Sequence, residues 1–191
     1  TFITKDELRA LVLEDMGEDR EATLLTQKLY TMLGILEPNT DLSDLTAGVL
    51  TDIVLGFFDT EENKLYIVGD DTDFSERDEL AVAHEFVHGL QQLHFDIKAI
   101  GESIDSNSDQ SRAFAALVEG DATLAQLVYR LEHFDEEEQA AAQAESAAAD
   151  LSACFAAPTV VRRTIAFPYA EGANYAISLL LETNDFELVN E

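Results

Sequence analysis

Both the fold and the chemistry of this chain can be inferred from one short sequence, His84-Glu85-Phe86-Val87-His88. Two histidines four residues apart share one face of an α-helix, so both imidazoles can reach a single metal ion. The glutamate next to the first histidine then lies where it can take a proton from a metal-bound water molecule. The pattern therefore predicts a metal-binding helix that also carries a carboxylate placed for proton transfer.

The residues around this pattern favour a helix. Leu80 to Leu93 contains strong helix formers and no proline, and Ser75 to Asp78 has the form of an N-cap followed by an acidic first turn. At about 100° per residue, His88 falls roughly 40° and Glu85 roughly 100° from His84. The apolar residues fall on the other side of the helix, which we expect to face the core. They are Val82, Ala83, Phe86, Val87, Leu90 and Leu93.

A zinc site that keeps one position open for water needs three protein ligands. Cys154 is the only cysteine, which excludes a thiolate-rich site, and Glu119 is the best candidate for the third ligand. It lies in a second expected helix, from about Ser111 to Arg130. Small residues around it, including Gly120, would allow a close approach to the histidine helix, as a zinc–carboxylate bond of about 2.0–2.2 Å requires. We therefore predict one zinc ion per chain, bound by His84, His88 and Glu119.

The histidine motif, followed by Glu119 in a Glu-Gly-x-Ala context, resembles the gluzincin branch of zinc metallopeptidases. More narrowly, the chain resembles a group of compact bacterial metallopeptidases that are largely uncharacterised. The resemblance extends from about Leu24 to near the C-terminus. One departure is the separation of His88 from Glu119 by thirty residues, which is longer than in the best-known gluzincins. The stretches that carry the resemblance are Gly56 to Asp59 with Lys64 to Val68, His84 to Asp96, Leu117 to Ala122, and Phe167 to Gly172.

This resemblance implies a zincin-like α+β fold, mainly helical, that hydrolyses peptide bonds in a peptide or protein substrate. Glu85 would be the general base, and zinc would lower the pKa of its water and polarise the scissile carbonyl. Gluzincins also place a Tyr or His opposite the zinc to stabilise the oxyanion, which makes Tyr169 the first candidate here and Tyr175 the second. Relatives are expected to extend beyond Glu191, so the chain can be part of a longer protein.

The surroundings of the histidines are less defined by the sequence. Metal-bound imidazoles usually donate their second N–H to a carboxylate or a carbonyl, and the sequence leaves three candidates open. We interpret His94 as a non-ligand, because it lies about 240° around the helix from His88. The candidate acceptors are Asp121, Asp78 and Glu171.

A β-hairpin is expected within residues 53–68. Ile53 to Phe58 and Lys64 to Val68 are short β-rich runs, and Asp59 to Asn63 between them has the composition of a turn. Zincin-like folds keep an edge strand above the zinc, where an extended peptide adds as a further strand. Leu65 to Val68 is our candidate for this edge strand. The alternative is a hairpin that only covers the helices.

We expect one zincin-like catalytic domain over residues 1–191. It would comprise N-terminal helices in 1–50, the hairpin in 53–68, metal-binding helices in 76–130 and C-terminal helices in 135–191. A polar link is expected over Gly101 to Asp109. The remaining helices are expected at Thr4 to Met16, Glu18 to Leu33, Leu42 to Thr51, Asp135 to Ala156 and Pro168 to Glu182.

Composition restricts the partners. The net charge of −28 argues against nucleic acids and anionic membranes, and suits neutral or basic peptides or a salty environment. An apolar content of 47% suffices for a globular core, and no run approaches the roughly eighteen apolar residues of a transmembrane helix. The chain begins at Thr1 without an apolar signal region. We favour an extracytoplasmic or membrane-anchored location, with any N-terminal signal or anchor absent from this sequence.

Other interpretations stay open. Asp70 to Asp73 and Asp105 to Asp109 are oxygen-rich and could bind structural Ca²⁺, although the second lacks the glycine and final glutamate of an EF-hand loop, and solvated loops are the better interpretation. A non-peptidase zinc hydrolase acting on a small amide would have a buried, narrow pocket instead of an open groove. A catalytically silent binding module that keeps the fold would have a zinc site blocked by a side chain, or no zinc.

Overall fold

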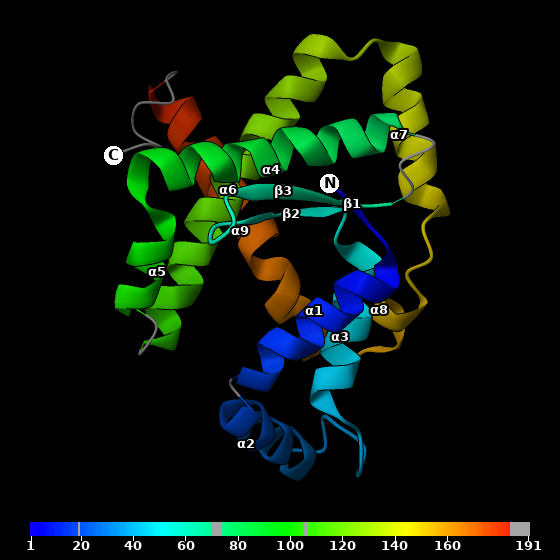
Figure 1. The fold of residues 1–191 in the computed structure, drawn as a ribbon, viewed down its shortest axis with the longest axis vertical. Coiled ribbons are helices and arrows are strands. Elements are labelled where there is room, and N and C mark those ends of the chain that lie inside the picture. The colour runs from blue at the N-terminus through cyan, green and yellow to red at the C-terminus, as the bar shows by residue number, and fades with distance from the viewer. Residues whose placement is uncertain (19, 70–73, 105–106, 184–191) are drawn as a thin grey trace.

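The structure is a computed structural model, and it describes residues 1–191 except 19, 70–73, 105–106 and 184–191. Long helices surround one small sheet (Figure 1), which confirms the predicted mainly helical α+β class. None of the helices in the described part of the chain combines the length and apolar character needed to cross a bilayer. The elements are β1 (Phe2–Ile3), α1 (Lys5–Glu18), α2 (Arg20–Met32), α3 (Leu42–Ile53), β2 (Gly56–Asp59), β3 (Lys64–Val68), α4 (Glu76–Phe95), α5 (Ile97–Ile104), α6 (Ser108–His133), α7 (Glu136–Ala148), α8 (Ser152–Ala156) and α9 (Thr159–Thr183).

The sheet confirms the hairpin but corrects its edge. β2 and β3 pair antiparallel, with Gly56 opposite Ile67. β1 pairs parallel to β3 on its other side, so the strand order is β1-β3-β2 and β3 is central. The prediction that Leu65 to Val68 is the edge strand was therefore wrong, and among the described residues the outer strands are β1 and β2. A two-residue strand such as β1 is too short to show an alternating pattern in the sequence. It is formed by pairing with a distant strand, for example through the hydrogen bond from the Ile67 N–H to the Thr1 carbonyl, 2.9 Å.

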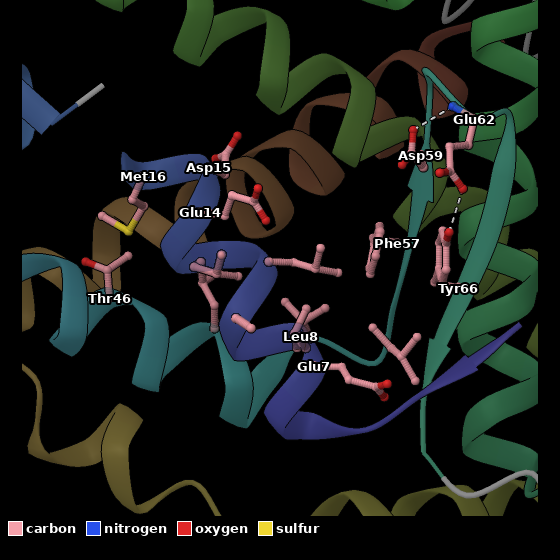
Figure 2. A pocket seen from close by; sticks show the side chains of 16 residues that line it. Glu7, Leu8, Glu14, Asp15, Met16, Thr46, Phe57, Asp59, Glu62 and Tyr66 are labelled. Atoms are coloured by element: carbon pink, nitrogen blue, oxygen red, sulfur yellow. Dashed lines mark hydrogen bonds between the residues drawn. The ribbon is translucent and has the colours of Figure 1, made fainter. Parts of the chain in front are cut away.

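The two faces of the hairpin are directed toward different helices. Phe58 faces α4, because a Cβ built on Gly89 would lie 3.3 Å from its ring. Phe57 and Tyr66 are on the other face, toward α1, where their rings stack with centroids 4.8 Å apart (Figure 2). The alternation of side chains along the strand therefore separates the α4 side of the sheet from the α1 side.

α4 forms where the sequence predicts, with a capping box between Ser75 and Asp78. Its burial, however, differs from the expected pattern. His84 and Glu85 are buried, at 8% and 7% exposure, whereas Phe86 and Leu93 on the apolar stripe are 61% and 76% exposed. The sheet and α6 pack on α4 beside the histidines, α7 also packs on α4, and Val82, Ala83 and Val87 of the stripe are half-buried. The expectation that this stripe faces the core was therefore wrong for its exposed members, Phe86, Leu90 and Leu93.

Three other helix boundaries differ from the prediction. α5 occupies part of the expected polar link, because isoleucines at positions 97, 100 and 104 recur at helical spacing and α5 packs on α6. The helix expected over 135–156 is divided into α7 and α8, since the Asp150 carboxylate accepts the Ser152 N–H, 3.0 Å, and starts a new helix. α9 begins at Thr159, not at Pro168, and continues through the proline.

α6 and α9 cross closely, four residues beyond the internal Pro168 of α9. The two backbones meet at Gly120 and Gly172, where a Cβ built on Gly172 would lie 3.0 Å from the Gly120 Cα and would overlap the Ala116 carbonyl. The close approach predicted from Gly120 is therefore present, but its partner is α9 and not the histidine helix.

We predict that Gly172→Ala lowers the free energy of unfolding by about 1–3 kcal/mol or more, since the added methyl group meets backbone atoms that cannot move aside. Gly17→Ala is the matched control. A Cβ at Gly17 has no atom within 4 Å, so this change should raise the free energy of unfolding by about 0.5–1 kcal/mol. Urea unfolding of the two variants measures both changes. Equal stability of the two variants would contradict the crossing.

Candidate metal centre

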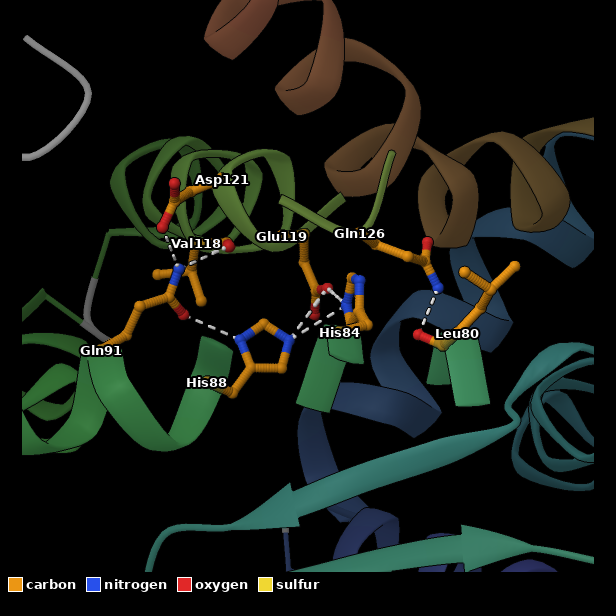
Figure 3. Close-up of polar contacts among 8 residues, drawn as sticks. All are labelled: Leu80, His84, His88, Gln91, Val118, Glu119, Asp121 and Gln126. Atoms are coloured by element: carbon orange, nitrogen blue, oxygen red, sulfur yellow. Dashed lines mark hydrogen bonds and ion pairs between the residues drawn. The ribbon is translucent and has the colours of Figure 1, made fainter. Parts of the chain in front are cut away.

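The structure brings together the three predicted metal ligands (Figure 3). His84 Nε2 lies 3.1 Å from Glu119 Oε2 and 3.2 Å from His88 Nε2, and His88 Nε2 lies 3.4 Å from Glu119 Oε2. Zinc bonds of about 2.0–2.1 Å in a tetrahedral site place neighbouring ligand atoms about 3.3 Å apart. The three atoms, contributed by α4 and α6, therefore have the separation of one face of a tetrahedral zinc site.

Glu85 adjoins this triangle on the side of the sheet. Its carboxylate and the ring nitrogens of His84 and His88 lie within 4.8 Å of one another, a grouping that could itself hold a metal ion. A Cβ built on Gly56 would lie 3.1 Å from the Glu85 Cγ, so β2 runs directly against this side chain. Glu85 is thus confined between α4 and the free edge strand, next to the three candidate ligands.

The site stabilises positive charge. Burial would raise the pKa of Glu119, but hydrogen bonds from His84 and His88 outweigh burial and lower this pKa to about 2. Burial would lower the pKa of His88, but its hydrogen bond to Glu119 and the charge of that carboxylate raise this pKa to about 9. A proton is therefore held among the ligands at neutral pH, and a bound metal would displace it.

Glu85 differs from Glu119 in its electrostatics. Burial raises the pKa of Glu85, and the neighbouring histidines only partly oppose this effect. A carboxylate with a raised pKa is a better proton acceptor than one whose pKa is lowered. The two glutamates thus differ within one cluster, with a lowered pKa for Glu119 and a raised pKa for Glu85.

A buried glutamine that the sequence analysis missed fixes the second histidine. Gln91 Nε2 donates to the Val118 carbonyl, 3.0 Å, and to Asp121 Oδ2, 2.8 Å. Its Oε1 therefore faces His88 Nδ1 at 2.8 Å, so Nδ1 carries a hydrogen and Nε2 is the nitrogen that a metal would take once its proton is displaced. The sequence contained a usable signal, because Gln91 follows His88 by three residues and shares its helix face.

The predicted carboxylate partners of the histidines are therefore corrected. Asp121 acts through Gln91 and not directly. Asp78 belongs to the capping box of α4, and Glu171 is exposed on α9. The position of a carboxylate in the sequence does not show which backbone or side-chain groups it already contacts.

Tyr169 is the candidate tyrosine that reaches the site. Its ring centroid lies 6.1 Å from that of His84, and both residues line one cavity of about 350 Å³. Partial burial, with the negative charges of Glu119 and Glu85, raises the pKa of Tyr169, so its hydroxyl keeps its proton. Tyr175 is 55% exposed and lies about 240° further around α9, which places it on another face.

The cavity lies between α3, β2, α4, α6 and α9. Gln126 is held there by a hydrogen bond from Nε2 to the Leu80 carbonyl, 2.8 Å (Figure 3), and the Thr123 hydroxyl is buried without a partner. His94 lines a different pocket, which fits its interpretation as a non-ligand. Besides Gln126, Thr123, His84 and Tyr169, the lining residues are Ile53, Val54, Leu55, Gly56, Ala81, Glu85 and Ala166.

Comparison of the chain with protein-family models, curated proteins and solved structures gave no match. The resemblance to gluzincins and the zincin-like fold therefore stay predictions. The first of the two clusters considered for Ca²⁺, Asp70 to Asp73, lies outside the described residues. The second does so in part, at positions 105 and 106.

We predict a graded loss of zinc affinity in two variants, measured by competition with a chromophoric chelator. Gln91→Leu should weaken binding roughly 10–100-fold, because His88 loses the acceptor that fixes its orientation and tautomer. Glu119→Ala removes a ligand and should weaken binding further. Gln110→Leu, an exposed position at the start of α6, is the control. Equal affinity of the Gln91 and Gln110 variants would remove Gln91 from the site.

Proposed function

We propose that this chain is a zinc-dependent hydrolase that cleaves peptide bonds, with Glu85 as the general base. The observation that supports it best is the triangle of His84, His88 and Glu119 atoms, 3.1–3.4 Å apart, with the buried Glu85 carboxylate beside it. Two imidazoles and one carboxylate are a ligand set that leaves a tetrahedral zinc one open position. Such a site suits hydrolysis better than a purely structural role.

Bound zinc would supply Lewis acidity, lowering the pKa of water and polarising the substrate carbonyl. The protein contributes the proton transfers. Glu85 takes the proton of the attacking water, holds it within the buried site, and then donates it to the leaving amine. Its raised pKa favours the first step, uptake of the proton from water. Gln91 keeps the His88 Nε2 lone pair directed at the metal position.

Tyr169 is proposed as the group that stabilises negative charge on the carbonyl oxygen during attack. Its raised pKa keeps the hydroxyl protonated, so it can donate a hydrogen bond to a developing oxyanion. The Gly120–Gly172 crossing supports this role, because Tyr169 lies three residues before Gly172 and so on the face of α9 that meets α6.

A peptide substrate is favoured by the position of β2. This strand has β3 on one side and no strand on the other among the described residues, and Gly56 adjoins Glu85. An extended peptide could therefore pair with the free N–H and C=O groups of β2 and pass in front of Glu85. The proposed substrate strand thus lies on β2, not on Leu65 to Val68.

A second candidate function is hydrolysis of a small amide. The cavity at the site, about 350 Å³, is near the lower limit of ligand pockets and would suit a small substrate. Comparison of a peptide library with small acyl amides as substrates of the same preparation separates the two functions.

We predict that the wild-type chain contains about one zinc and hydrolyses peptides, and that Glu85→Gln keeps the zinc but loses hydrolysis, because only the proton acceptor is removed. Metal content by elemental analysis and cleavage of a peptide library are measured on the same samples. His88→Ala should lose both zinc and activity. Full activity of the Glu85→Gln variant would contradict the role of Glu85 as general base. Wild-type protein that contains no zinc after reconstitution would favour the catalytically silent binding module.

Tyr169→Phe should lower kcat about 10²-fold with little change in KM, since the hydroxyl acts on the transition state and the ring that packs near His84 is kept. Tyr175→Phe is the matched control, and its kinetics should equal those of the wild type. A large change in KM at constant kcat would assign Tyr169 to substrate binding instead.

A further inference from the structure

A second, larger cavity of about 880 Å³ lies on the face of the sheet opposite α4. It is a groove between α1, α3 and the hairpin of β2 and β3 (Figure 2). This volume is near the upper limit of pockets that bind ligands. The predicted metal site does not use this groove, and the sequence analysis did not anticipate it.

The inner surface of the groove is apolar. Leu8 of α1 is 3% exposed, and Phe57 points toward it from β2, stacked on Tyr66 (Figure 2). Leu11, also on α1, lines the groove and is 45% exposed. Ten of the sixteen lining residues are apolar or aromatic, so a bound ligand could bury apolar side chains here.

The polar residues around this apolar surface are almost all acidic. Glu14 and Asp15 lie on the α1 side of the groove, and Asp59 and Glu62 lie on the side of the hairpin (Figure 2). Glu7, in the first turn of α1, also lines the groove. The lining includes no Lys, Arg or His.

Intramolecular contacts do not neutralise these carboxylates. Glu7 and Asp59 accept backbone N–H groups as local caps, and Glu62 accepts the Tyr66 hydroxyl. One lysine adjoins the groove, Lys64, 3.8 Å from Glu62. Five carboxylates against one adjacent ammonium group leave the groove strongly negative.

We propose that this groove binds a polypeptide segment that combines leucine-like side chains with Lys or Arg. The apolar surface would bury the aliphatic side chains, and the surrounding carboxylates would select cations and exclude anions. A polypeptide is favoured over a small amphiphile because the groove borders β2, whose free edge offers N–H and C=O groups to an extended backbone.

One consequence depends on the proposed hydrolysis. Val54 lines both this groove and the cavity at Glu85, so the two meet at the start of β2. A segment bound in the groove could continue along β2 past Glu85. The groove would then bind the basic, apolar part of a substrate next to the bond that is cleaved.

The test is the affinity of a fluorescein-labelled peptide of alternating leucine and lysine, measured by fluorescence anisotropy. In an extended peptide this alternation places all leucines on one face. The Glu85→Gln chain is used so that the peptide is not cleaved. Peptide binding in the groove does not require hydrolysis. A peptide that does not bind would therefore contradict the groove proposal without contradicting the proposed hydrolysis. A lack of hydrolysis would contradict the proposed function without contradicting the groove proposal.

Leu11→Ser should raise the Kd about tenfold, since part of the apolar surface is lost. Leu25→Ser on α2, 59% exposed and outside the groove, should leave it unchanged. Replacing leucine by serine in the peptide should also abolish measurable binding. Circular dichroism of each variant separates a lost contact from a lost fold.

The charge of the groove is tested with a pair of double variants. Glu14→Gln with Asp15→Asn should raise the Kd about fivefold and weaken its salt dependence. Glu132→Gln with Glu137→Gln removes the same charge from exposed positions outside the groove and should have no effect.

The proposal would be overturned if both double variants weakened binding equally, because this would indicate attraction to the whole acidic surface. It would also be overturned if the peptide did not bind while a cationic detergent did, which would assign the groove to a small amphiphile. A dimer in sedimentation that dissociates on Leu11→Ser would assign it to a second copy of the chain.

Discussion

The contact of Glu119 with His84 and His88 is the interaction on which the surrounding structure depends. Both histidines are largely buried, and Glu119 is the anionic group that contacts them from α6. Buried polar and charged groups are costly unless they are paired, and the cost of breaking such a pair is larger than its net contribution when intact. A rotation or slide of α4 against α6 would leave these groups unsatisfied. The cluster therefore fixes how the two helices pack, before any metal is considered.

This constraint explains why part of the apolar stripe of α4 is exposed. Surface helices usually bury their apolar face, but here the face that carries the histidines lies between α6 and the sheet. Phe86 and Leu93 consequently face outward. The buried cluster of His84, His88 and Glu119 thus takes precedence over full burial of the apolar residues of this helix.

Around this pair, α9 and the sheet complete the site from opposite sides. The contact of Gly120 with Gly172 brings α9 close enough for Tyr169 to approach His84. Gly56 allows β2 to run against Glu85. In both places the absence of a side chain lets a backbone approach, and a side chain of the candidate site, Tyr169 or Glu85, is positioned as a result. The sheet also separates two environments, a polar site toward α4 and an apolar, acidic-rimmed groove toward α1.

The features determined by the sequence alone are local ones. The helix with His84 and His88, its capping box and the β2–β3 hairpin depend on periodicity and turn residues, and Glu119 was identified by its small neighbours and its context. Other features depended on the tertiary structure. These include the central position of β3, the outward apolar stripe, the continuation of α9 through Pro168, the role of Gln91 and the acidic groove. Each depends on contacts between residues far apart in the chain, and periodicity within one segment contains no information about which partner covers which face.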